Sequence, residues 1–224
     1  MTRPSLDLTL YLIVGPSHVD GDPVPLVEDA VRGGVTLVQL RDKTSTTRAM
    51  VETARRLKAA LAGTGVSLLI NDRADVAAAS GADGVHLGRD DLTPAQARAI
   101  LGPDRIVGVT VKNPAEARAV EPGIVDYASV GGVFATESKV NPDAPIGLSG
   151  LRDMAAVLTA GVPGLPRCAI AGIDGSRAAD VIAAGVDGIC VVSAITRAPD
   201  PHQAARDLRA IVDAAKRDHE RALA

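Results

Sequence analysis

Aromatic residues are almost absent from this 224-residue chain, which contains one Phe, two Tyr and no Trp. Proteins that bind single-stranded nucleic acids stack the bases on aromatic side chains, so this composition argues against that class of function. Basic residues are not in excess either: 24 Lys and Arg stand against 27 Asp and Glu, and no basic run is long enough to cover a nucleic-acid or membrane surface. We therefore expect no nucleic acid and no membrane among the partners.

Long apolar runs and clusters of metal-binding residues are also missing. The apolar run in MTRPSLDLTLYLIVG is too short for a signal peptide or a membrane-spanning helix, so we expect a cytoplasmic protein. Cys168 and Cys190 lie in apolar segments with no second Cys or His at metal-binding spacing, and we interpret them as reduced core thiols. Of the four His, only His86 is expected to reach a pocket, although a structural role is the preferred interpretation.

A repeated pattern of short apolar segments and Ala-rich segments predicts the fold. Strands are expected over residues 10–14, 36–41, 67–71, 84–87, 105–110, 126–131, 167–172 and 188–193. Between several of them lie segments with helical periodicity, such as 46–63, 93–101, 151–160 and 176–185. About eight units of roughly 28 residues predict a single TIM (β/α)8 barrel over residues 1–224. A doubly wound open sheet is the alternative, and nothing in the sequence marks the reversal point that it needs.

Polar residues follow the predicted second strand, where VQLRDK places Gln39, Arg41 and Lys43 two residues apart. Alternate side chains of a strand share a face, so these three groups are expected to converge. The active site of a βα barrel lies at the carboxyl ends of its strands. Two cations on one face at this end predict an anionic ligand.

Carboxylates and an amide follow the next two strands. Asn71 and Asp72 end the third strand, and Asp90 and Asp91 follow the fourth. Carboxylate oxygens together with substrate phosphates are what Mg²⁺ prefers, so a magnesium site is predicted here. The alternative is that both segments are local structure: an ordinary turn in NDRAD, and two acids near the start of a helix capped by Thr93.

A second anion site is expected at the last loops. Gly172 lets the backbone approach a ligand closely, and a short helix is expected to begin near Ser193. Phosphate held by the loops after strands seven and eight is a recurring barrel arrangement. Further polar residues of the expected strand ends are Thr110, Thr136, Ser138 and Lys139. Two anion sites in one mouth predict two phosphorylated small-molecule substrates.

Several of these segments carry a resemblance to a known family. In order from Leu10 to Ile195 they are LYLIV, VQLRDK, LLINDRADVAAASGADGVHLG, GGVFATESK, AIAGI and GICVVSAI. Together they resemble thiamine phosphate synthases. The resemblance implies a βα barrel that joins 4-amino-2-methyl-5-(hydroxymethyl)pyrimidine diphosphate to 4-methyl-5-(2-phosphoethyl)thiazole, or its carboxylated form, and releases pyrophosphate with Mg²⁺.

Carried over by position, the resemblance also implies roles for individual residues. The pyrimidine diphosphate would be bound by Gln39, Arg41, Lys43, Asn71, Thr110 and Lys139, of which Arg41, Lys43 and Lys139 would act in catalysis. Asp72 and Asp91 would hold Mg²⁺. The thiazole phosphate would be bound by Thr136, Ser138, Gly172, Val192 and Ser193.

The chain departs from the family pattern at three positions. The family usually has Ser where Thr110 stands, His where Lys112 stands and Thr where Glu137 stands. Thr110 keeps the hydroxyl group. We predict that Lys112 and Glu137 form a compensating ion pair at the rim of the site, with two solvated side chains as the alternative.

Three other functions were weighed against the synthase. A thiazole tautomerase would need an acid–base group and would not need the diphosphate-binding cations. A barrel isomerase acting on a sugar phosphate would need a general base pair and would leave the second anion site unexplained. A sensor that binds thiamine intermediates without turnover stays open, as does the formation of a homo-oligomer.

Overall fold

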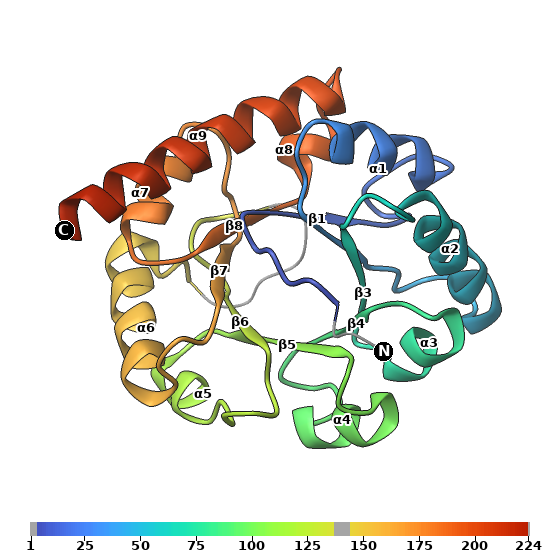
Figure 1. The fold of residues 1–224 in the computed structure, drawn as a ribbon, viewed down its shortest axis with the longest axis horizontal. Helices are drawn as coiled ribbons and strands as arrows, with labels where there is room; N and C mark the ends of the chain where they lie inside the picture. Colours follow the sequence, from blue (N-terminus) through green and yellow to red (C-terminus); the bar gives the residue numbers. More distant parts are fainter. Residues whose placement is uncertain (1–3, 137–143, 224) are drawn as a thin grey trace.

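The strands form a closed barrel in this computed structural model, which describes residues 4–136 and 144–223. The barrel consists of β1 (Leu10–Val14), β2 (Leu37–Leu40), β3 (Ser67–Asn71), β4 (Gly84–Leu87), β5 (Ile106–Val111), β6 (Tyr127–Val130), β7 (Arg167–Ile170) and β8 (Gly188–Val191). Each strand pairs in parallel with the next, and β8 pairs in parallel with β1 (Figure 1). The predicted TIM barrel is confirmed, and the open sheet is excluded by the β1–β8 pairing.

Helices surround the barrel (Figure 1). They are α1 (Pro23–Arg32), α2 (Thr47–Ala60), α3 (Ala74–Ser80), α4 (Pro94–Leu101), α5 (Pro114–Arg118), α6 (Gly147–Gly161), α7 (Ala178–Ala183), α8 (Ser193–Thr196) and α9 (Pro201–Leu223). The long α9 packs against both α7 and α1, so it bridges the last and first units of the ring. No helix in the described part of the chain combines the length and apolar character needed to cross a membrane.

Several strands end earlier than the sequence predicts. The expected strand 167–172 stops at Ile170, because Ala171 and Gly172 have φ values of 98° and 64°. A positive φ turns the chain out of the extended conformation. Similarly, β2 ends at Leu40 and β8 at Val191. The residues expected at the ends of these strands therefore belong to loops at the barrel mouth or, for Ser193, to the start of α8.

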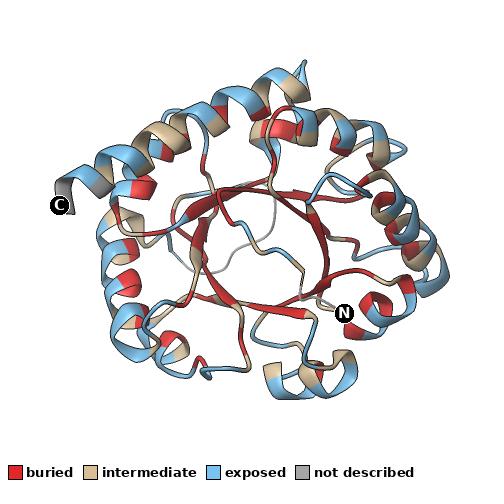
Figure 2. Ribbon diagram, viewed as in Figure 1, coloured by how far each residue is buried: buried red, intermediate tan, exposed pale blue. Residues whose placement is uncertain are grey.

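The core has an outer and an inner part, because successive strand residues point to opposite sides of the barrel wall. In β1, Leu10, Leu12 and Val14 belong to the cluster under the helices, whereas Tyr11 and Ile13 belong to the barrel interior. Figure 2 shows the strands as the most continuously buried part of the molecule. The interior thus contains Tyr11, and also the chain's other tyrosine, Tyr127.

The N-terminal segment closes the bottom of the barrel. Leu8 is buried in the interior cluster with Leu37, Ile106 and Cys168, and Leu6 packs against it. In Figure 1 this segment, drawn in blue, runs across the barrel before it enters β1. The opposite end, formed by the carboxyl ends of the strands, remains open to cavities.

Candidate active site

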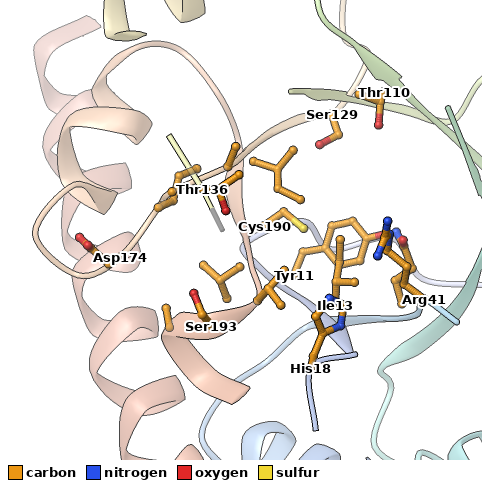
Figure 3. Close-up of a pocket in the computed structure, with 18 of the residues that line it drawn as sticks. Tyr11, Ile13, His18, Arg41, Thr110, Ser129, Thr136, Asp174, Cys190 and Ser193 are labelled. Carbon is orange, nitrogen blue, oxygen red and sulfur yellow. The ribbon is translucent and has the colours of Figure 1, made fainter. Parts of the chain in front are cut away.

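Two adjoining cavities lie at the carboxyl ends of the strands. The larger, which we call the large cavity, has a volume of about 560 Å³, and the small cavity about 360 Å³. Arg41, Asn71, His86 and Thr110 line both. Figure 3 shows Thr136 and Ser193 on one side of the large cavity and Arg41 and Thr110 on the other. All the predicted site residues that the structure describes line one or both cavities: Gln39, Arg41, Lys43, Asn71, Asp72, Asp91, Thr110, Thr136, Gly172, Val192 and Ser193.

Two carboxylates meet in the small cavity. Asp72 follows β3 with a φ of 63°, a conformation that Asp tolerates better than most residues. One oxygen of Asp91 accepts a hydrogen bond from the Gly88 N–H at 2.7 Å. Burial raises the pKa of Asp91, and the adjacent Asp72 carboxyl raises it further. A shared positive charge would relieve this repulsion, and the Lys43 ammonium already pairs with Asp72.

Local structure accounts for part of both segments, and Asp91 itself accepts a local hydrogen bond from the Gly88 N–H. Helix α4 is capped by Thr93, whose side chain accepts from the Gln96 N–H while the Gln96 side chain accepts from the Thr93 N–H. In NDRAD the surface pair is between Arg73 and Asp75, and its hydrogen bond lowers the pKa of Asp75. Thr93 caps the helix as predicted, and the side chains of Asp72 and Asp91 are left to face the small cavity.

The cations come from the loop after β2 rather than from a continued strand. Asp42 shapes this loop by accepting the N–H groups of Thr44 and Ser45 at 3.0 and 2.9 Å. Burial raises the pKa of Asp42, but the hydrogen bonds from Ser45 and Thr44 outweigh burial and lower it overall. Arg41, just before Asp42, lines both cavities, and Lys43, just after it, lines only the small one. Gln39 and Arg41 therefore line the same cavity, as expected for alternate residues of a strand. The position of Lys43 in the small cavity is set by the loop instead.

The far side of the large cavity is built from the loops after β6, β7 and β8. Helix α8 begins at Ser193, as the sequence predicts, and the first N–H groups of a helix have no intrahelical acceptor. Gly172 is needed for packing: a Cβ at this position would overlap the carbonyl oxygen of Ala135. Because Gly172 has no side chain, the loops after β6 and β7 can approach each other beside the cavity.

A chain of hydrogen bonds crosses the barrel interior beneath both cavities. The Gln39 amide donates through Nε2 to Tyr11 Oη, which lies 3.0 Å from Tyr127 Oη. Tyr127 Oη lies 2.6 Å from His86 Nδ1, and His86 Nε2 lies 2.8 Å from Thr110 Oγ1. Burial raises the pKa of Tyr11 and of Tyr127 well above 10, so both phenols stay protonated. We call these five residues the polar chain.

Comparison with known proteins agrees with this geometry. Residues 10–195 match the sequence model of the family described as thiamine monophosphate synthase. A protein from Agrobacterium fabrum named thiamine-phosphate synthase is 50% identical over 211 residues, which cover 94% of this chain and 96% of that protein. One from Xanthobacter autotrophicus with the same name is 51% identical over 217 residues, covering 96% and 100%. The chain belongs to the thiamine monophosphate synthase family.

A solved structure extends the family likeness to three dimensions. It is a thiamine phosphate pyrophosphorylase from Pyrococcus furiosus, which superposes with a TM-score of 0.81 at 36% sequence identity. The match covers 93% of this chain and 96% of that one. The barrel of this thiamine monophosphate synthase family member is therefore similar in extent and arrangement to a solved barrel with a related name.

The sequence failed to single out several residues of the site. The expectation that His86 alone among the histidines faces a pocket is wrong, because His18 also lines the large cavity. Arg177 lines it too: its guanidinium lies 4.8 Å from the centre of the Phe134 ring and donates to the Gly172 carbonyl at 2.5 Å. Only its position just after a predicted strand could have indicated this Arg. Tyr11 lies in the segment LYLIV, where nothing in the sequence marks its hydroxyl as part of the site.

Three predicted residues cannot be placed against this geometry. Glu137, Ser138 and Lys139 lie outside the described residues. Lys112 lines the small cavity, with its N–H donating to Glu116 at 2.7 Å, and its pairing with Glu137 stays a prediction. Cys168 and Cys190 are buried free thiols, as predicted, although Cys190 also lines the large cavity.

Proposed function

We propose that the protein is a transferase that synthesises thiamine phosphate. It would join 4-amino-2-methyl-5-(hydroxymethyl)pyrimidine diphosphate to 4-methyl-5-(2-phosphoethyl)thiazole and release pyrophosphate. The observation that carries the proposal is the pair of adjoining cavities, one with cations and paired carboxylates and the other reaching the phosphate-binding loops of the barrel. Family membership supports the same activity.

The pyrimidine diphosphate is assigned to the region where the cavities meet. Gln39 and Asn71 supply amide groups there, Thr110 a hydroxyl group, and Arg41 and Lys43 positive charge. Lys139 would add a third cation. The diphosphate would then lie in the small cavity and the pyrimidine ring over the buried Gln39.

A magnesium ion fits the paired carboxylates of Asp72 and Asp91. Among the described residues no group of three or more His, Cys, Asp or Glu side chains is arranged to hold a metal. Two carboxylates suffice for Mg²⁺, which usually keeps several waters and takes its other ligands from substrate phosphates. When bound, the ion would help neutralise the negative charge of the diphosphate.

The thiazole phosphate is assigned to the far side of the large cavity. Thr136, Gly172, Val192 and Ser193 line that side, and Ser138 would complete the set. Arg177 and Arg197 also line the cavity and provide positive charge that a carboxylated thiazole could use. Both forms of the thiazole are therefore proposed as substrates, and the carboxylated form would release its carboxyl group as CO2 to give the same product.

The reaction would need no protein nucleophile. The bond between the pyrimidine methylene and the diphosphate oxygen breaks, and its electron pair leaves with pyrophosphate. The ring amino group stabilises the cation that remains, and the lone pair of the thiazole nitrogen then forms the new C–N bond. Arg41, Lys43 and Lys139 stabilise the charge growing on the leaving group, and a preorganised donor of this kind contributes about 3 kcal/mol. Binding both rings at the same end of the barrel would bring the thiazole nitrogen close to the pyrimidine methylene, which is the other requirement of the reaction.

One assay tests the proposal. The purified protein is incubated with both phosphates and Mg²⁺, and thiamine phosphate and pyrophosphate are measured. Equimolar formation of both products is expected, and each should disappear when either substrate is left out. Binding of both compounds by folded protein without product would favour the sensor instead. Conversion of the thiazole alone would favour the tautomerase.

A further inference from the structure

The hydrogen bonds of the polar chain all have the same donor-to-acceptor direction, from Gln39 at one end to Thr110 at the other. Gln39, Tyr11, Tyr127 and His86 are all buried, with Gln39 and Tyr11 each 1% exposed. They come from β2, β1, β6 and β4, and Thr110 comes from β5. Buried hydroxyl and amide groups need partners, because each unpaired one costs roughly 1–3 kcal/mol. The donors and acceptors along the chain are therefore linked.

The direction follows from the amide at one end. Gln39 Nε2 donates to Tyr11 Oη, so the Tyr11 O–H is directed at its other partner, Tyr127 Oη. Tyr127 has then accepted one hydrogen bond and donates its own O–H to His86 Nδ1. His86 consequently carries its proton on Nε2, which donates to Thr110 Oγ1. Each hydroxyl in the chain accepts one hydrogen bond, and those of Tyr11 and Tyr127 also donate one.

The residues at the two ends of the chain, Gln39 and Thr110, both line the large cavity. Gln39 Oε1 is buried and has no hydrogen-bond partner within the part of the chain that the structure describes. Thr110 receives a hydrogen bond from His86, which leaves its hydroxyl hydrogen available for a ligand. The site therefore offers an acceptor at Gln39 and a donor at Thr110.

We propose that Tyr11, Tyr127 and His86 are positioning residues that fix this polarity and thereby select a pyrimidine with a 4-amino group over one with a 4-oxo group. The 4-amino group can donate a hydrogen bond to Gln39 Oε1. A 4-oxo group is itself an acceptor, so its oxygen would repel Oε1. The inference rests on the proposed function, since it assigns the pyrimidine to Gln39.

The opposite polarity makes a contrary prediction. If the Gln39 amide were turned over, every hydrogen bond in the chain would reverse. His86 would then carry its proton on Nδ1, and Gln39 would present Nε2 to the cavity. That arrangement also satisfies both phenols, but it would favour the 4-oxo ligand. The two polarities thus differ in ligand preference and in the position of one proton.

Binding to the monophosphate esters of the two pyrimidines tests the selection without turnover. Calorimetric titration of the wild-type protein should show the 4-amino compound binding more tightly than the 4-oxo compound. Tyr127→Phe cuts the chain at its centre, and Tyr11→Phe frees the Gln39 amide to rotate. Each variant should lower the ratio of the two affinities by about tenfold, the effect of one hydrogen bond. Cys168→Ala changes the same interior cluster without removing a hydrogen bond of the polar chain and should keep the wild-type ratio.

A measurement on the unaltered protein covers the case in which the Phe variants do not fold. Nitrogen-15 NMR of the four His should find neutral His86 protonated at Nε2. Protonation at Nδ1, or folded Phe variants with the wild-type affinity ratio, would overturn the inference. A wild-type protein that prefers the 4-amino ligand but forms no thiamine phosphate would instead refute the proposed function and leave the polarity standing.

Discussion

At the scale of single residues, the site depends on charges that are balanced before any ligand arrives. Lys43 pairs with Asp72, while burial and the Asp72 carboxyl raise the pKa of Asp91. Arg41 lines both cavities, so it can serve the diphosphate and also the junction with the large cavity. The consequences of removing these charges can be separated by kinetics.

The two carboxylates should control the response to magnesium. We expect Asp72→Asn and Asp91→Asn each to raise the Mg²⁺ concentration needed for half-maximal activity by about tenfold or more, because each removes a charge and keeps the shape. Asp75→Asn, in the same segment as Asp72 but paired with Arg73, is the control and should respond as the wild type does. An unchanged magnesium response in both variants would place the metal elsewhere.

The cations should affect turnover more than substrate binding. Arg41→Ala and Lys139→Ala are expected to lower kcat by about 10²-fold, because charge on departing pyrophosphate exists mainly in the transition state. Steady-state kinetics with both substrates varied would show this, with Arg73→Ala as the control. A rise in KM at constant kcat would show instead that these residues bind the substrate and the transition state equally well.

At the scale of elements, the loops after the strands are fixed by their backbones as much as by their side chains. Ala171 and Gly172 both have positive φ, and Gly172 lies against the Ala135 carbonyl. This contact holds together the loops after β6 and β7, which carry Thr136 and Gly172, two of the residues assigned to the thiazole phosphate.

Gly172→Ala should therefore damage stability and thiazole binding together. The added Cβ meets backbone atoms at a φ of 64°, so we expect a loss of about 2 kcal/mol or more and a fall in Tm of about 4–8 °C. KM for the thiazole phosphate should rise more than KM for the pyrimidine. Gly175→Ala is the matched control, because its Cβ would meet only Ile211 Cδ1 at 3.4 Å. Equal melting temperatures for the two variants would show that the loop adapts.

The elements were largely predictable from the sequence, and their ends were not. Short apolar segments located the eight strands that the structure describes, and glycines and Thr93 marked helix ends. The early end of β7 depends on the positive φ of Ala171, which cannot be predicted from the residue type alanine.

The polar chain could not be predicted from the sequence, because Tyr11 and Tyr127 are 116 positions apart and only barrel closure brings their hydroxyls together. Arg41, Asn71 and Thr110, by contrast, line the cavities as expected from the rule that barrel sites lie at the strand ends.

At the scale of the whole molecule, buried acids of high pKa set the limit of stability at alkaline pH. Burial raises the pKa of Cys168 from 9.0 to about 12. Above pH 9 the thiol ionises in the unfolded chain but not in the folded one, so the unfolded state binds fewer protons and the free energy of unfolding falls as pH rises. Tyr11 and Tyr127 act with the same sign.

We therefore expect Tm to fall progressively between about pH 9 and about pH 12, with each such group contributing up to about 1.4 kcal/mol per pH unit. Cys168→Ala should make this decline shallower, because it removes one of the groups. Leu69→Val, in the same interior cluster but without a proton to lose, should keep the wild-type slope in the same thermal scans. A slope that Cys168→Ala leaves unaltered would contradict the assignment.

The closure of the barrel bottom by Leu6 and Leu8 makes the molecule a cup rather than a tunnel. Whatever reaches the buried Gln39 amide enters past the rim and leaves by the same way. A molecule seated at the rim then blocks the traffic of anything beneath it. Of the two proposed substrates, the pyrimidine, which is assigned next to the buried Gln39, would therefore enter first, and the joined product would have to leave before the next pyrimidine could enter.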